Sequence, residues 1–179
     1  WETTRGSWKV QDGALVNSAF GNQAAVIGTI DQKEPVTLEA DVESLSGQNM
    51  QFGLVLFASD RENYYGRDSI VAQISSHNYN IMVCSQGNTN HVQDGMLPQR
   101  PWVKGVMRAA YDPETKKFSL WANTQPLGEW VVAQAPTTGR YVLLFTQQPI
   151  KINSLRVLPG VVRPTATDEL LTAAGLTFR

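Results

Sequence analysis

Apolar and polar residues alternate along much of this chain, the pattern of strands with one buried and one open face. The pattern is clearest in the segment VTLEADVESL, residues 36–45. About a dozen short segments of strand character follow one another, separated by turns rich in Gly, Asn, Asp and Pro. This spacing predicts an all-β protein built as an antiparallel two-sheet sandwich.

Two apolar runs, FGLVLF and YVLLF, lack the alternation and predict either central strands that are covered on both faces or strands that cross from one environment to another. Elsewhere the period of two defines a predicted core, in which Trp8 and Trp102 are also expected to be largely buried. The inward-facing set comprises Val36, Leu38, Ala40, Val42, Phe52, Leu54, Leu56, Ile70, Ala72, Ile74, Tyr79, Ile81, Val83, Leu143 and Phe145.

Helical signals are confined to the end of the chain. Thr167 can cap the segment DELLTAA, and Gly175 can end it. The sequence therefore predicts one domain over residues 1–158, followed by a linker and short helix over 159–179 that lead out of it. Because the chain begins with Trp1 rather than Met, we expect it to be a segment of a longer protein, covalently linked to further domains.

Composition narrows the classes of function. The 179 residues carry a net charge of -1 and no basic run, which argues against a nucleic-acid partner. No apolar run has the length of a membrane span, so no membrane insertion is expected. The single cysteine, Cys84, lies in an apolar run and is expected to be a buried thiol. Phosphate-loop, dinucleotide, G-x-S-x-G and H-E-x-x-H motifs are absent from the sequence.

The order of several segments resembles the concanavalin A-like lectin/glucanase superfamily, and laminin G-like domains in particular. The segments are GSWKVQDGALV, VTLEADV, FGLVLFASDRENYY, PWVKGVMRAAYDPETKKFSLWAN and KINSLRVLP. The resemblance implies a jelly-roll sandwich in a secreted, periplasmic or cell-surface protein of bacterial origin. Lectins, carbohydrate-binding modules, adhesion domains and glycosidases share this fold, so the fold alone does not choose among them.

The acidic residues Glu39, Asp41 and Glu43 match the E-x-D-x-E spacing of laminarinase-type beta-glucanases. In that family the first Glu is the nucleophile, the Asp assists and the last Glu is the acid/base. The row comes early in the chain, however, and small residues and short loops surround it. We therefore expect it to be the solvated face of a strand, with glycosidase activity as the alternative.

Two places combine aromatic rings with groups that bind hydroxyls. The loop SDRENYYGRD holds Arg61, Tyr64 and Tyr65, although two such tyrosines can equally be lids on a core. The second place is the hairpin around DPET, where we expect Tyr111 to face Lys116. That register puts Trp121 on an open face as a platform for sugar stacking, unless a cationic stem covers the ring. Its expected partners are Lys104, Arg108, Ser119 and Asn123.

No cofactor is expected, and a calcium ion held by loop oxygens is the alternative. Its candidate ligands are Asp60, Asn63, Asn88, Asn90 and Asp94. The sequence thus predicts a noncatalytic module that binds a glycan or another protein, with a sugar-processing enzyme that uses Glu39 and Glu43 as the alternative.

Overall fold

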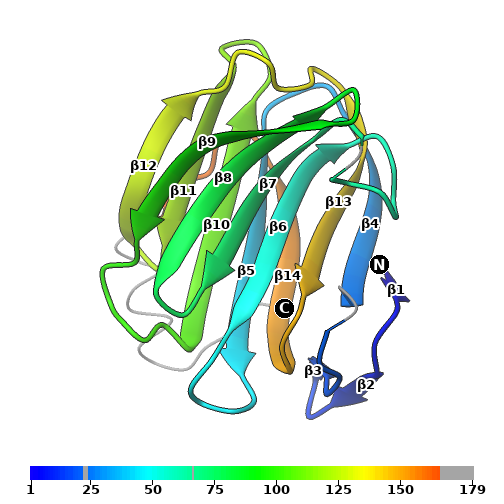
Figure 1. Cartoon of the computed structure of the whole chain (residues 1–179), viewed down its shortest axis with the longest axis vertical. Coiled ribbons are helices and arrows are strands. Elements are labelled where there is room, and N and C mark those ends of the chain that lie inside the picture. Colours follow the sequence, from blue (N-terminus) through cyan, green and yellow to red (C-terminus); the bar gives the residue numbers. More distant parts are fainter. Residues whose placement is uncertain (22–23, 66, 166–179) are drawn as a thin grey trace.

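A computed structural model describes residues 1–21, 24–65 and 67–165, and every regular element in them is a β-strand. The strands form two antiparallel sheets of seven strands each, stacked face to face (Figure 1). The predicted all-β sandwich is therefore confirmed. The expected helix after Thr167 lies outside the described residues. No helix in the described part of the chain is long and apolar enough to cross a membrane.

The front sheet of Figure 1 has the order β1-β4-β13-β6-β7-β8-β9. Its strands are β1 (Glu2–Thr4), β4 (Ala24–Gln32), β6 (Gln51–Ala58), β7 (Ser69–Ser75), β8 (Asn78–Ser85), β9 (Asn88–Met96) and β13 (Gly139–Thr146).

The back sheet has the order β12-β11-β10-β5-β14-β3-β2. Its strands are β2 (Trp8–Gln11), β3 (Ala14–Asn17), β5 (Val36–Ser44), β10 (Lys104–Asp112), β11 (Lys117–Ala122), β12 (Gln125–Val131) and β14 (Ile150–Pro159).

The main hydrophobic core lies between the two sheets and follows the predicted period of two. Val36, Leu38, Ala40 and Val42 of β5 face the apolar residues of β6, β7 and β8 across it. Trp102 is fully buried there, stacked on Phe52 at 6.0 Å between ring centroids. Trp8 is partly buried and packs against the core from its border, so it is less completely buried than Trp102.

A second apolar cluster covers part of the outer face of the front sheet, the face turned away from the back sheet. Leu143 and Phe145 belong to this cluster, so their predicted position in the main core is wrong. Both side chains are buried nonetheless, because the loop between β6 and β7 covers them with Tyr64 and Tyr65. The unalternating runs of β6 and β13 are thus covered on both faces, as predicted.

The edges of the two sheets meet where β9 and β12 lie side by side at the left of Figure 1. The Tyr79 hydroxyl donates to the Leu127 carbonyl at 3.4 Å, and the Tyr79 and Trp130 rings are 5.9 Å apart. Gly95 makes room for this contact, because a Cβ at that position would lie 2.2 Å from the Tyr79 ring. The contact joins β8 of the front sheet to the edge strand β12 of the back sheet.

The hairpin of β10 and β11 differs in register from the prediction. Asp112 pairs with Lys117 and Tyr111 with Phe118, a shift of two residues from the expected pairing with Lys116. A shift of two leaves every side chain on its predicted face, because the side-chain period of a strand is two. Trp121 accordingly stays on the outer face of the back sheet, opposite Arg108.

Candidate functional site

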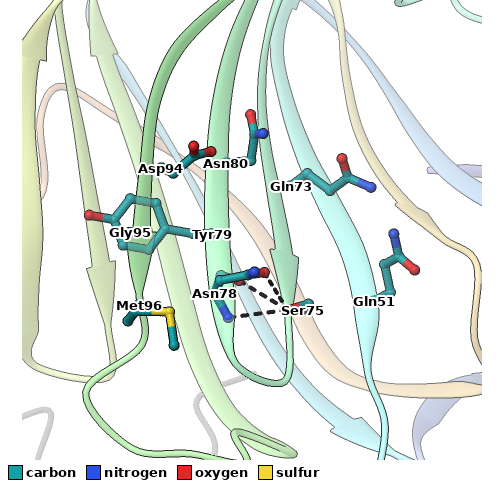
Figure 2. A pocket seen from close by; sticks show the side chains of 9 residues that line it. All are labelled: Gln51, Gln73, Ser75, Asn78, Tyr79, Asn80, Asp94, Gly95 and Met96. Atoms are coloured by element: carbon teal, nitrogen blue, oxygen red, sulfur yellow. Dashed lines mark hydrogen bonds between the residues drawn. The ribbon is translucent and has the colours of Figure 1, made fainter.

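A hollow of about 480 Å³ opens on the outer face of the front sheet, over strands β6 to β9 (Figure 2). Most of its lining residues carry an amide, hydroxyl or carboxylate group, and no Lys or Arg belongs to the lining. The lining residues are Gln51, Gln73, Ser75, Asn78, Tyr79, Asn80, Asp94, Gly95 and Met96.

Strand geometry brings these polar side chains together. Gln73 of β7 pairs with Asn80 of β8, and Asn80 pairs with Asp94 of β9, so the three residues form a row across the strands. Neighbouring strands lie about 4.8 Å apart, and the row therefore spans roughly 10 Å. Figure 2 shows the three side chains side by side on their strands. The alternate residues, such as Ile74 and Ile81, face the core and fix the orientation of the row.

A second polar row follows one step further along the strands. Gln51 pairs with Ser75, and the Ser75 hydroxyl donates to Asn78 Oδ1 at 2.6 Å. The same hydroxyl accepts the Asn78 and His77 backbone N–H groups. Ser75 is therefore held in place by its own turn, whereas Gln51 has no side-chain hydrogen bond recorded among the described residues.

Two acceptor groups stand out within the hollow. Asn80 Oδ1 is buried and has no hydrogen-bond partner in the described part of the chain. Asp94 Oδ1 lies 2.6 Å from His91 Nε2, and the Asp94 side chain is otherwise mostly exposed. A buried amide oxygen without a partner costs free energy, and rotation of the Asn80 side chain toward a ligand donor would remove that cost.

Three aromatic rings cover another part of the same outer face, over β6 and β13, and do not line the hollow. The Phe145 ring lies over Gly53, where an added Cβ would be 2.1 Å from Phe145 Cε1. Tyr64 stacks on Phe145 at 5.1 Å between centroids, and Tyr65 meets the same ring at 5.8 Å. Burial raises the pKa of Tyr64 and raises that of Tyr65 to about 12. We call Tyr64, Tyr65 and Phe145 the aromatic lid.

In the sequence analysis, Tyr64 and Tyr65 could either bind a ligand or cover the core. The aromatic lid matches the second of these expectations, because both rings pack on apolar residues. Tyr64 is only 3% exposed. Arg61 forms an ion pair with Glu2 at 2.6 Å and does not line the hollow. A binding role for this loop stays a prediction, and the burial of Tyr64 counts against stacking on its ring.

The acidic residues Glu39, Asp41 and Glu43 of β5 lie on the outer face of the back sheet, and one of them is buried. Glu39 is 3% exposed, so the expectation of a fully solvated row is wrong for that residue. Arg156 Nε donates to Glu39 Oε1 at 2.9 Å, and Arg108 Nε donates to Glu39 Oε2. Glu43 is more open and lies 4.0 Å from Lys104.

Asp41, between them, is partly buried. Burial raises the pKa of the Asp41 carboxyl, and a hydrogen bond from Asn153 at 3.4 Å opposes that rise. The three acidic residues thus differ. Two arginines hold the buried Glu39 carboxylate, Asp41 is partly buried, and the Glu43 carboxylate is partly exposed.

The predicted Trp121 platform is covered. Its indole is 6% exposed, and Arg108 beside it is 5% exposed. Ser119 donates to Glu129, while Asn123 Oδ1 accepts the Val106 backbone N–H, which leaves the expected partners engaged in local contacts. Binding at Trp121 stays a prediction, although the indole presents no open stacking face in this structure.

The calcium candidates fall into two separate groups. Asp60 and Asn63 lie in the loop after β6, where Asp60 Oδ1 accepts the Glu62 and Asn63 backbone N–H groups, which hold its pKa below the usual range. Asn88, Asn90 and Asp94 lie on β9. Calcium binding stays a prediction.

Sequence reasoning missed the hollow: among its lining residues, Asp94 is predicted only as a calcium candidate and Tyr79 only as a core residue. The signal was present in the alternation of QISSHNYNI, where polar residues occupy the outward positions of two paired strands. Amide side chains on a strand look the same in sequence whether they face open solvent or a hollow.

No protein-family model matches the sequence, and no curated protein matches it. Solved structures do resemble the fold. The carbohydrate binding module CBM66 from Bacillus subtilis matches with a TM-score of 0.67 and 13% identity, over 88% of this chain and 94% of that chain. The Emp47p carbohydrate recognition domain matches with a TM-score of 0.68 and 14% identity, over 90% and 89%.

A beta-glucanase of Bacillus licheniformis also matches, with a TM-score of 0.61 and 10% identity over 84% of this chain and 81% of that chain. These likenesses show the fold: the protein has the concanavalin A-like sandwich of lectins and glucanases, as the sequence predicted. At such low identity the chemistry has to be argued from this chain's own residues.

Proposed function

We propose that the protein is a noncatalytic carbohydrate-binding module that holds a glycan in the hollow over β6 to β9. The observation that carries the proposal is the lining, in which four carboxamides, two hydroxyl-bearing side chains and one carboxylate surround a single open depression. Carboxamides both donate and accept hydrogen bonds, as sugar hydroxyls do. A rigid sheet presents them, which keeps the entropic cost of binding low.

The structural neighbours support a function that involves sugars. Two of them are described as a carbohydrate binding module and a carbohydrate recognition domain, and a third as a beta-glucanase. They do not choose between binding and catalysis, so that choice rests on the residues of this chain.

The acidic row argues against hydrolysis at β5. A retaining glycosidase needs two carboxyl groups about 5 to 5.5 Å apart on either side of the scissile bond. Glu39 is buried and held by Arg108 and Arg156, so its carboxylate is withdrawn from any substrate on this face. The hollow itself contains a single carboxylate, Asp94, rather than a pair.

The proposal is tested by screening the protein on an array of oligosaccharides and measuring the affinity of bound glycans by calorimetry. Gln73→Leu places an apolar side chain of similar size at the β7 end of the polar row. We expect it to weaken binding about tenfold or more, because a ligand hydroxyl then loses its partner. The change should leave the melting temperature nearly unaltered, because Gln73 is not fully buried.

Gln125→Leu is the matched control, since Gln125 is exposed on β12 of the other sheet and outside the hollow. It should retain full affinity. Equal binding by both variants, or no glycan bound by the parent protein, would contradict the proposed function.

A further inference from the structure

Asn80 and Asp94 form a directly opposed pair in the lining of the hollow, on the side of the edge strand β9. They are register partners on β8 and β9, and side chains in such pairs have Cβ atoms about 5 Å apart. Asn80 Oδ1 is buried and lacks a partner within the described residues. Asp94 shares one of its oxygens with His91, and its side chain is about two-thirds exposed, at 68%.

Asp94 presents hydrogen-bond acceptors rather than donors to a ligand, because an ionised carboxylate accepts only. Asn80 Oδ1 is a second acceptor, but it is buried, so a ligand donor reaches it only when the Asn80 side chain rotates. No Lys or Arg lines the hollow, and the basic side chain beside Asp94 is His91, at 2.6 Å. A ligand that brings an O–H or N–H group is therefore favoured at this point, and an anionic group would face Asp94 without a Lys or Arg to compensate its charge.

We propose that Asn80 and Asp94 determine specificity by selecting glycans with a hydroxyl or amino group at this position and rejecting those with a carboxylate or sulfate. This inference rests on the proposed function and adds the class of sugar that the hollow accepts. A hydroxyl donates to one of the two acceptors, and an amino group has enough N–H bonds to donate to both. Uronate and sulfate groups bring acceptors and a like charge to the same place.

The test uses an array with matched sets, each a neutral oligosaccharide with its amino, uronate and sulfated counterparts. For every backbone that the protein binds, the uronate or sulfated form should bind at least about tenfold more weakly than the neutral form. The difference in affinity between the neutral and anionic forms should become smaller at high salt, because screening weakens repulsion between exposed charges.

Asp94→Asn removes the charge and keeps the shape of the side chain. This substitution should bring the ratio of the affinities for the neutral and anionic forms close to one. Asp12→Asn is the matched control, because Asp12 is exposed in the turn between β2 and β3, away from the hollow, and Asn accepts its positive φ of 51°. The control variant should keep the same ratio of affinities for neutral and anionic forms as the parent protein.

Asn80→Leu tests the other acceptor by replacing the amide with an apolar group of similar size. It should weaken binding of the neutral and amino forms about tenfold. Far-ultraviolet circular dichroism and the melting temperature confirm that each variant is folded.

The outcomes separate the two proposals. If no member of the array binds, the proposed function is overturned, and the specificity falls with it. If neutral and anionic forms bind equally to the parent protein, the function stands and the specificity is overturned. If Asp94→Asn keeps the parent ratio, or if Asn80→Leu binds as the parent does, the assignment of specificity to this pair is overturned.

Discussion

Glu39 shows how a single residue can belong to a catalytic pattern in sequence and to a structural ion pair in the fold. Alternation correctly places it on the outer face of β5, but it does not reveal the neighbours on adjoining strands. Those neighbours are Arg108 on β10 and Arg156 on β14, which are about 70 and 120 residues away in sequence. The burial of the carboxylate could not have been predicted without the strand order.

We expect Glu39→Gln to destabilise the protein by about 3 kcal/mol, because it leaves the buried Arg108 guanidinium without its carboxylate. Glu43→Gln on the same strand is the control, since its carboxylate is partly exposed and 4.0 Å from Lys104. That change should cost less than about 1 kcal/mol. Urea unfolding of both variants measures the difference, and equal stabilities would contradict the structural role of Glu39.

At the scale of elements, the strands of the front sheet differ in how they are covered. Strands β6 and β13 are covered on both faces, whereas the outer face of β7 to β9 opens into the hollow. The runs in β6 and β13 correctly predicted cover on both faces. Leu143 and Phe145 were nevertheless assigned to the wrong side, because an apolar run carries no period that tells one face from the other. What covers the outer face is a loop, and the position of a loop over a sheet is not encoded in strand periodicity.

A local irregularity in β6 likewise depends on contacts with segments that are distant in sequence. Phe57 has a positive φ of 54° and points into the core beside Leu56, while its N–H donates to Gln32 Oε1 at 2.9 Å. Gln32 in turn donates to the Tyr141 carbonyl at 2.9 Å. A bulge of this kind depends on one buried amide from another strand, and nothing in the sequence around Phe57 marks it.

The aromatic lid depends on Gly53, which leaves space for the Phe145 ring. Gly53→Ala should destabilise the protein by about 2 kcal/mol, since the new methyl group overlaps the ring and displaces it from beneath Tyr64. In a Phe145→Leu background the same change should cost clearly less, because the overlapping ring is gone. Chemical unfolding of the four proteins of this cycle measures the coupling. Additive effects would contradict the lid's dependence on Gly53.

For the whole molecule, the sequence predicted the sandwich well because strand alternation reports directly on which face is buried. Val36, Leu38, Ala40 and Val42 lie in the core as expected. The binding surface was harder to find, because it consists of common amide residues whose importance comes from their neighbours across the sheet. The two candidate surfaces also lie on opposite outer faces of the sandwich, one around Trp121 and one around Asn80.

The most direct measurement is a nuclear magnetic resonance titration of the labelled protein with a glycan that it binds, following side-chain amide and indole signals. We predict that the side-chain NH₂ signals of Gln51, Gln73, Asn78 and Asn80 shift together as the glycan saturates, while the Trp121 indole N–H signal stays in place. Shifts confined to Trp121 and its neighbours on the back sheet, with the four amides unmoved, would contradict the account.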